Sequence, residues 1–391
     1  MSLAERSILV VDDVPENRDL LLRRLQRLGF SRIDQAENGV QALAAIAAKA
    51  YDLVLLDIMM PALDGFGVLE ALKHDGRIGD LPVVVISALN EIDPVVRCIE
   101  LGAEDFIFKP FNPTLLRARV LATLEKKMLR DRTREELRRK QLELNEARTL
   151  QLSLVPPPFS GTVGGRRLQI EVLLEPAQEV GGDLVDHFRV GDDLIALALG
   201  DVSDKGAGSA LMMARTHAML RGLAGRPDAA DLFRAPERAA GLINAALAEG
   251  NASCMFVTLV LASFDAASGR LAYVRAGHIP PYLRRASGGL VRLDKLSGPP
   301  LGLDGELVYS AGETTLDAGD RVLIVTDGFT EAQDAEGRLY GDACVAAFAA
   351  EIAPTEQAAL HRLFGDVRRY EQGRPASDDV AGILLTLGAQ G

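Results

Sequence analysis

The N-terminal third of the chain alternates short apolar runs with amphipathic stretches. The apolar runs are Ile8–Val11, Leu53–Leu56, Val83–Ile86 and Phe106–Phe108, with a weaker one at Arg32–Ala36. The stretches with apolar residues at helical spacing are Asn17–Leu28, Gly39–Ala48, Phe66–Lys73, Pro94–Leu101 and Thr114–Leu124. Apolar strands that alternate with helices predict a parallel sheet covered on both faces. We therefore predict a doubly wound, flavodoxin-like α/β domain with five parallel strands over residues 1–124.

A long helical stretch follows, from Thr114 to about Leu154, with no Gly and no Pro. As one helix it would be about 60 Å long. After Leu124 its apolar positions become sparse, and residues 125–148 carry nine basic and six acidic side chains. Leu137, Leu144 and Gln151 lie seven apart, which is a broken heptad pattern. We predict a helical linker over residues 125–155 and favour a dimeric coiled coil, with a solitary solvated helix as the alternative.

The C-terminal part, residues 156–391, shows strand-like runs interrupted by helical blocks. The predicted strands are Leu168–Leu174, Leu194–Leu199, Phe256–Phe264, Arg270–Arg275, Tyr282–Arg284, Val322–Thr326 and Val380–Leu387. The predicted helices are Gly208–Ala224, Pro236–Glu249 and a block near Ala343–Arg369, with loops at residues 224–228 and 288–289. Runs of strands with separate helices predict an α+β sandwich with helices packed outside the sheets.

Length and composition favour a multidomain globular protein. The 391 residues predict two or three domains, and the net charge of −12 makes a nucleic-acid partner improbable. The three cysteines form no CxxC pair, so a disulfide framework is not expected and a reducing compartment fits. We find no apolar run of membrane-spanning length and no signal-peptide pattern, and we expect a cytoplasmic protein without a membrane partner.

Chemically active side chains follow the predicted strands of the first domain. Asp12 and Asp13 end the first run, and Asp57 ends the run at Leu53–Leu56. Ser87 and Lys109 end two further runs. A cluster of oxygen ligands suits Mg²⁺, and Asp57 could accept a phosphoryl group whose oxygens Mg²⁺ and Lys109 neutralise. The alternative, that each Asp is only a turn former or helix cap, is less able to explain all these positions together.

This segment resembles, over its whole length, the receiver domain of two-component response regulators. The resemblance implies that a cognate histidine kinase phosphorylates Asp57 and that the Lys109–Pro110 peptide is cis. It implies that Mg²⁺ binds at Asp12, Asp13, Asp57 and Met59. It also implies a switch made of Ser87, Phe106 and Lys109.

Aspartates also lie at strand ends in the C-terminal part. Asp183 precedes a strand, Asp201 and Asp327 end strands, and Asp378–Asp379 precede the last one. Each of these positions alone is explained by a turn or a cap. Together they predict a site for two divalent cations, where a shared, acidified water attacks phosphorus without a covalent intermediate. The cysteine-phosphatase signature is absent, and the five His form no zinc motif.

A set of motifs resembles the metal-dependent protein serine/threonine phosphatases of the bacterial sporulation and stress type. The segments are Glu179–Phe188, Gly200–Leu211, Arg275–Pro280, Gly298–Leu303, and Thr326–Ala332 with Tyr340–Gly341. The resemblance implies two Mn²⁺ or Mg²⁺ ions held by Asp183, Asp201, the Val202 carbonyl, Asp327 and Asp378. Within this set it implies that Asp201 bridges both ions and that the catalytic residues are Asp201, Asp327 and Asp378.

Other positions of these motifs receive different interpretations. Asp379 is the less favoured ligand of its pair, and His278 is interpreted as structural rather than catalytic. Val185 and Asp204 depart from the family pattern, where an aromatic residue and a glycine are frequent. Because Val185 and Asp204 are neighbours of the expected metal ligands and not ligands themselves, we expect these departures to affect substrate binding more than metal binding.

We expect a response regulator whose phosphorylation at Asp57 controls a phosphoserine/phosphothreonine phosphatase. The resemblance implies that its substrate is a phosphorylated anti-anti-sigma factor of the STAS type in a partner-switching pathway. We expect the chain to form a homodimer through the linker helix. The alternative is a weak or inactive adaptor that binds a sigma-factor regulator. A DNA-binding output finds little support, because no helix-turn-helix pattern follows the receiver.

Overall fold

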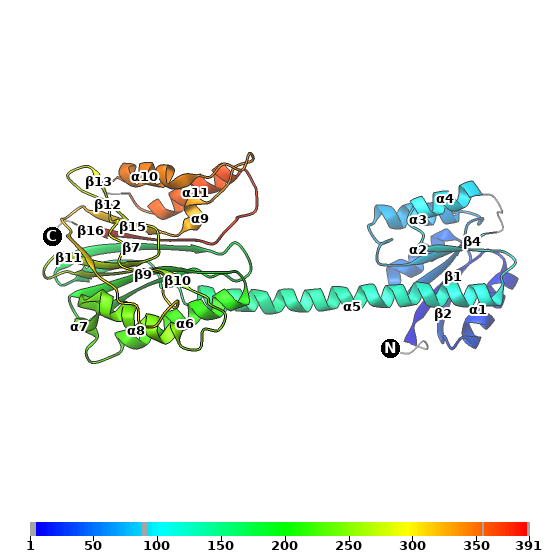
Figure 1. Cartoon of the computed structure of the whole chain (residues 1–391). Coiled ribbons are helices and arrows are strands. Elements are labelled where there is room, and N and C mark those ends of the chain that lie inside the picture. Colours follow the sequence, from blue (N-terminus) through cyan, green and yellow to red (C-terminus); the bar gives the residue numbers. More distant parts are fainter. Residues whose placement is uncertain (1–4, 88–91, 354–355, 389–391) are drawn as a thin grey trace. The chain divides into compact units, whose positions relative to one another are not determined.

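The computed structural model describes residues 5–87, 92–353 and 356–388. The chain forms two compact units, residues 1–140 and 141–391 (Figure 1). Among the helices of the described ranges, none combines the length and the apolar character needed to cross a membrane.

The first unit has a parallel sheet in the order β2-β1-β3-β4-β5. Its strands are β1 Ser7–Val11, β2 Arg32–Ala36, β3 Leu53–Asp57, β4 Val83–Ser87 and β5 Asp105–Phe108. Its helices are α1 Pro15–Arg27, α2 Gly39–Ala48, α3 Gly65–His74, α4 Ile92–Glu100 and the start of α5 Pro113–Leu152. The predicted flavodoxin-like domain with five parallel strands is confirmed.

Two apolar clusters, one for each face, hold this sheet between its helices. The cluster formed with α2, α3 and α4 contains Val11, Leu56 and Val68. The other cluster joins Val10 and Leu55 to side chains of α1 and α5. Since both faces are covered, β1, β3 and β4 are almost entirely apolar, and the side chains of Asp57 and Ser87 lie at strand ends.

The second unit contains two antiparallel sheets, in the orders β14-β11-β10-β9-β8 and β13-β12-β15-β16-β7-β6. Its strands are β6 Phe159–Val163, β7 Arg166–Glu175, β8 Leu184–Val190, β9 Leu194–Val202, β10 Val257–Asp265, β11 Arg270–Ala276, β12 Tyr282–Arg284, β13 Leu290–Arg292, β14 Gly312–Thr315, β15 Arg321–Val325 and β16 Val380–Leu387. Its helices are α6 Ala207–Ala224, α7 Ala229–Arg234, α8 Pro236–Ala248, α9 Asp327–Thr330, α10 Gly341–Glu351 and α11 Ala359–Glu371.

The two sheets of this unit enclose an apolar core to which both contribute, with Leu197 on β9 and Ile383 on β16 as examples. Helices α6 and α8 cover the outer face of the five-stranded sheet. Helices α10 and α11 cover the outer face of the six-stranded sheet (Figure 1). The predicted α+β sandwich with external helices is confirmed.

Several elements differ from the prediction. The strands β6, β13 and β14 and the short helices α7 and α9 were not expected, and the bounds of β8, the strand after Asp183, were not predicted. The block near Ala343–Arg369 is two helices, α10 and α11, rather than one. In β8, Asp186 and His187 are buried, and these polar residues hide the strand from a search for apolar runs.

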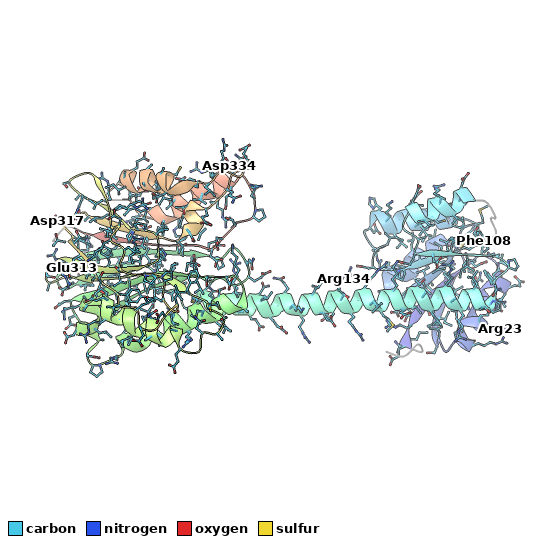
Figure 2. All side chains as sticks on the ribbon, in the orientation of Figure 1. Arg23, Phe108, Arg134, Glu313, Asp317 and Asp334 are labelled. Atoms are coloured by element: carbon cyan, nitrogen blue, oxygen red, sulfur yellow. The ribbon has the colours of Figure 1, made fainter. Side chains whose placement is uncertain are left out.

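Helix α5 begins on the first sheet and its last residues belong to the second unit. Leu116, Val120 and Leu124 join the core of the first unit. Farther along the helix, Arg130 pairs with Glu104, and Arg134, which projects from α5 in Figure 2, pairs with Asp80. The helix ends at Leu152, two residues before the predicted end.

Candidate functional site

The carboxyl edge of the first sheet brings three aspartates together. Asp12 and Asp13 follow β1, Asp57 is the last residue of β3, and one oxygen from each lies within 4.8 Å of the others. The Lys109 ammonium lies 2.8 Å from Asp12 Oδ2 and 2.8 Å from Asp57 Oδ2. Three carboxylates around one position are the ligands that Mg²⁺ prefers, so these residues fit the ion.

Asp57 is held firmly and is almost fully buried. Its Oδ1 accepts a hydrogen bond from the Ile58 N–H at 2.9 Å. Burial raises the pKa of its carboxyl group, while the hydrogen bond and charge of Lys109 act in the opposite direction. Gly65, the first residue of α3, lies so close that a Cβ there would be 2.4 Å from the Asp57 carbonyl oxygen. The start of α3 therefore packs directly on the strand that carries the candidate phosphorylation site.

The other predicted receiver residues lie at the same edge. Ser87 ends β4 and is buried, and its carbonyl oxygen accepts a hydrogen bond from the Lys109 N–H at 2.8 Å. Phe106 lies in β5 and contacts the Phe108 ring edge-on, with ring centroids 5.1 Å apart. The Lys109–Pro110 peptide is cis, as expected. Met59 has an exposed side chain just after β3, and Ala88 lies outside the described residues.

Two residues that support this edge were not predicted. Asn17 Nδ2 donates a hydrogen bond to Asp12 Oδ1 at 3.1 Å. The buried Arg18 donates to the Asp12 carbonyl oxygen at 2.7 Å and ion-pairs with Glu37 at 3.0 Å. In the sequence, Asn17 and Arg18 look like solvent-facing residues of an amphipathic helix. The fold shows that they contact and orient Asp12.

In the second unit, aspartates from both sheets converge. Asp183 immediately precedes β8 and Asp201 lies in β9, and β8 pairs with β9 through Leu184 and Gly200, one residue away from each aspartate. Asp327 begins α9 directly after β15, and Asp378 lies just before β16, the strand next to β15. Face-to-face packing of the sheets thus brings residues nearly 200 positions apart to one site.

Asp183 is buried and Asp201, Asp327 and Asp378 are half-buried, without enough positive charge to neutralise them. Burial, followed by the charge of Asp201, holds the pKa of Asp183 well above its ordinary value. Burial and the charges of Asp327 and Asp378 raise the pKa of Asp201 to about 7. Burial and the charges of Glu331 and Asp378 raise the pKa of Asp327 to about 6. A group of carboxylates that repel one another in this way fits divalent cations.

The phosphatase-type aspartates, which are Asp183, Asp201, Asp327, Asp378 and Asp379, are spread more widely than those of the first unit. In the described part of the chain, the one carboxylate trio within 4.8 Å is that of Asp12, Asp13 and Asp57. Instead, Asp183 Oδ2 accepts a hydrogen bond from Thr326 Oγ1 at 2.9 Å, and Asp378 Oδ2 lies 3.1 Å from the Lys205 ammonium. Lys205 was not among the predicted site residues.

Asp379 has a positioning role. Its carboxylate accepts hydrogen bonds from the backbone N–H groups of Ala177 at 2.8 Å and Gly182 at 2.7 Å. A Cβ at Gly181 would lie 2.1 Å from Asp379 Oδ2, so a glycine is required there. Asp379 therefore fixes the loop that precedes Asp183.

His278 is buried away from these carboxylates. Burial lowers its pKa to about 4, so its ring is neutral at pH 7, and its Nδ1 lies 3.1 Å from the Ile279 carbonyl oxygen. Its own carbonyl oxygen accepts a hydrogen bond from Arg275 at 2.9 Å. These contacts support the structural interpretation. Val185, one of the two departures from the family pattern, is buried in the core between the sheets.

Gln151 was predicted only as a heptad position, but it contacts the loop before Asp183. Its side chain is buried, donates to the Gly181 carbonyl oxygen at 2.9 Å and accepts from the Gly181 N–H at 3.0 Å. The last turn of α5 is therefore joined to the segment that carries a candidate metal ligand.

Comparisons with known proteins agree with this arrangement. The family described as Stage II sporulation protein E (SpoIIE) matches residues 191–388, and the response regulator receiver domain matches residues 8–121. The range 191–388 contains Asp201, Asp327 and Asp378 but not Asp183.

Individual relatives cover parts of the chain. A probable transcriptional regulator, ycf27, of Cyanidium caldarium is 38% identical over 122 residues, which are 31% of this chain and 47% of the relative. Protein IcfG of a Synechocystis strain is 29% identical over 221 residues, 51% of this chain and 34% of the relative. The chain spans about half the length of the first such relatives.

Among solved structures, the SiaA-PP2C domain of Pseudomonas aeruginosa matches with a TM-score of 0.55 and 18% identity. The match covers 65% of this chain and 99% of that domain. At this identity the likeness shows a shared fold. The predicted pairing of a receiver domain with a phosphatase-type domain of the sporulation type is confirmed.

Proposed function

The chain belongs to the SpoIIE family, with a receiver domain ahead of the family domain, and from this premise we propose that it is a phosphorylation-controlled protein phosphatase. Phosphorylation of Asp57 by a histidine kinase would set the rate at which the second unit hydrolyses phosphoserine or phosphothreonine in a partner protein. The expected compartment is the cytoplasm.

One observation carries this proposal: four separate segments bring Asp183, Asp201, Asp327 and Asp378 to one site of the second unit, and the pKa of the first three is raised. Asp183, Asp201, Asp327, Asp378 and the Val202 carbonyl would hold two Mn²⁺ or Mg²⁺ ions. Bound divalent cations would supply the positive charge that attracts phosphoryl oxygens and activates water. The protein residues hold that charge in place, and no cysteine is needed as a nucleophile.

The receiver half of the proposal rests on its own geometry. Mg²⁺ at Asp12, Asp13, Asp57 and Met59, together with Lys109, would neutralise the oxygens of a phosphoryl group on Asp57. The switch residues would be Ser87, Phe106 and Lys109. The distances among Asp12, Asp13, Asp57 and Lys109 support the proposed roles of these four residues.

A phosphorylated anti-anti-sigma factor of the STAS type is the substrate that we propose, by analogy with the sporulation and stress phosphatases. Its dephosphorylation would free it to bind an anti-sigma factor. Nucleic acid and membrane are not proposed as partners.

We also propose that the chain is a homodimer through α5. Leu137 and Leu150 on this helix are 62% and 70% exposed. Near its end, Leu144, Leu150 and Leu211 of α6 line an apolar groove of about 530 Å³. Leu137→Glu or Leu150→Glu should shift the mass measured by light scattering from dimer toward monomer, and a mass unchanged in both variants would refute dimerisation through α5.

The enzymatic activity is tested with a phosphoserine protein and Mn²⁺. The wild-type chain should release phosphate, and Asp201→Asn should release at least 100-fold less, because a carboxylate that would hold the divalent cations is lost. Equal inactivity of wild type and variant would favour the adaptor alternative, in which the second unit only binds a sigma-factor regulator.

Control by the receiver is tested separately. Phosphate release is compared with and without beryllofluoride, using Asp57→Asn as the control that cannot respond. A change of rate in wild type alone supports the coupling, and equal rates in all four measurements refute it.

A further inference from the structure

Lys205 lies beside Asp378, one of the aspartates of the candidate phosphatase site. It lies in the loop between β9 and α6, four residues after Asp201. Its ammonium donates to the Ser377 carbonyl oxygen at 2.5 Å and lies 3.1 Å from Asp378 Oδ2. Among the residues that the structure describes, it is the only basic side chain ion-paired with any of the five aspartates at 183, 201, 327, 378 and 379.

The backbone of this loop is fixed by hydrogen bonds, whereas the lysine side chain is half-exposed to solvent. Ser203 N–H donates to the Phe256 carbonyl oxygen at 2.9 Å, and Phe256 N–H donates to Ser203 Oγ at 2.9 Å. Asp204 and Gly206 have φ angles of 70° and 89°, so the chain turns sharply on both sides of Lys205. The Lys205 side chain is 49% exposed, and its four-carbon stem lets the ammonium reach solvent at the site.

We propose that Lys205 binds the phosphoryl oxygens of the substrate and of the product phosphate. This inference rests on the proposed phosphatase function. Phosphate carries a charge of about −2 at pH 7 and needs positive charge around its oxygens. Lysine binds phosphate as a mobile point charge. Once Asp378 is neutralised by a divalent cation, the Lys205 ammonium no longer faces an uncompensated carboxylate, and an incoming phosphoryl group becomes its best partner.

The competing interpretation is that Lys205 only neutralises Asp378 and thereby stabilises the fold. The two interpretations predict different measurements. A phosphoryl-binding lysine affects phosphate affinity when the cation sites are saturated. A neutralising lysine affects stability and cation affinity and leaves phosphate affinity unchanged.

The test uses the full chain saturated with Mn²⁺, as wild type, Lys205→Met and Lys205→Arg. Lys295→Met is the matched control, because Lys295 also donates to a carbonyl oxygen, that of Ala311, but has no contact with the aspartates. Binding of inorganic phosphate and of Mn²⁺ is measured by calorimetry, and circular dichroism confirms folding.

We expect Lys205→Met to weaken phosphate binding about 10-fold or more, as for the loss of one charge-assisted hydrogen bond. Lys205→Arg should stay within about 3-fold of wild type because it keeps the charge. Mn²⁺ affinity should not fall, and the KM for a phosphoserine peptide should rise. Unchanged phosphate affinity in Lys205→Met, or no phosphate binding by wild type, overturns the inference. Phosphate binding by wild type without any hydrolysis would refute the proposed function alone.

Discussion

Asp201 and Asp186 lie on neighbouring strands of the same sheet, but their environments are opposite. The Asp201 carboxyl has its pKa raised to about 7 by burial and by other carboxylates. Asp186 is fully buried and accepts two hydrogen bonds from Arg221, one of them at 2.7 Å, with His217 3.3 Å away. The ionised Asp201 carboxylate therefore destabilises the metal-free fold, whereas the Asp186 carboxylate holds α6 in place through Arg221.

Substitution of these two aspartates should therefore change stability in opposite directions. Without metal, Asp201→Asn should raise the free energy of unfolding, by about 1.4 kcal/mol for each unit of pKa shift that it relieves. Asp186→Asn should lower it by about 1.5–3 kcal/mol, because the Arg221 charge loses its partner. Urea denaturation in the presence of EDTA measures both, and a loss of stability in Asp201→Asn would contradict the repulsion argument.

Cation binding should depend on pH. Since the raised pKa values of Asp201 and Asp327 are about 7 and 6, both groups hold protons at pH 5.5 and release them to bind a cation. Mn²⁺ affinity should rise between pH 6 and 8 with release of protons, which calorimetry in two buffers detects. Affinity that is constant over this range would show that the carboxylates are already ionised.

The same groups affect the metal-free fold in a defined direction. Their pKa is higher in the folded chain than the ordinary value of 3.8, so the native state binds more protons. Their contribution to the free energy of unfolding is most favourable below about pH 4, and it is lost progressively as the pH rises to about 7. Saturating Mn²⁺ should remove this loss, which thermal melts with and without EDTA would measure.

At the residue scale, aspartates at strand ends were predictable because an apolar run followed by Asp is a visible signal. Lys205 was not, because a lysine between Asp204 and Gly206 looks like a solvated loop residue. Arg18 likewise looks like the polar face of an amphipathic helix. Their roles depend on which distant segment lies opposite, and single-chain patterns do not contain that information.

At the scale of elements, the end of α5 is the feature most open to experiment. Gln151 makes two hydrogen bonds to Gly181, and Gly182 in turn is held by Asp379. Gln151→Leu should leave the buried polar groups of Gly181 without partners and lower stability by about 1–3 kcal/mol. It should also weaken Mn²⁺ binding, because the loop before Asp183 is no longer fixed.

Gln141→Leu is the matched control for this prediction. Its side chain is on the same helix and donates a solvent-exposed hydrogen bond to Glu179 at 3.3 Å, a contact of little energetic weight. If both variants bind Mn²⁺ equally well, the contact of Gln151 with Gly181 has no role in the site.

Long, strongly patterned elements were predicted well, and short or polar ones were not. The buried strands β1, β3, β4 and β16 and the long helix α5 have patterns that tertiary contacts do not override. The bounds of strand β8 were not predicted because Asp186 and His187 are buried inside it, and α9 was missed because it has only four residues. The pairing order of two interleaved sheets depends on long-range contacts and cannot be read from local pattern.

At the scale of the whole molecule, the chain joins a receiver domain to a phosphatase-type domain, and their two groups of aspartates differ in how closely they are gathered. The receiver's trio of aspartates is assembled within 4.8 Å, whereas no such trio exists in the described residues of the phosphatase-type site. Beryllofluoride should therefore tighten Mn²⁺ binding in the second unit at least several-fold if the receiver promotes its assembly. Asp57→Asn should abolish that effect, and calorimetric titration of Mn²⁺ provides the measurement.

Because α5 is one continuous helix, inserting residues into it rotates one end of the helix about its axis relative to the other end. Each residue of an α-helix advances the direction of the chain by about 100°, and seven residues bring it within about 20° of two full turns. Alanines inserted after Arg138, between the contact of Arg134 with Asp80 and the contact of Gln141 with Glu179, change that phase without touching either site. A response to beryllofluoride that vanishes with one or two inserted residues and returns with seven would mean that the signal travels as rotation of a stiff rod. A response that declines steadily with length would mean that proximity alone carries it.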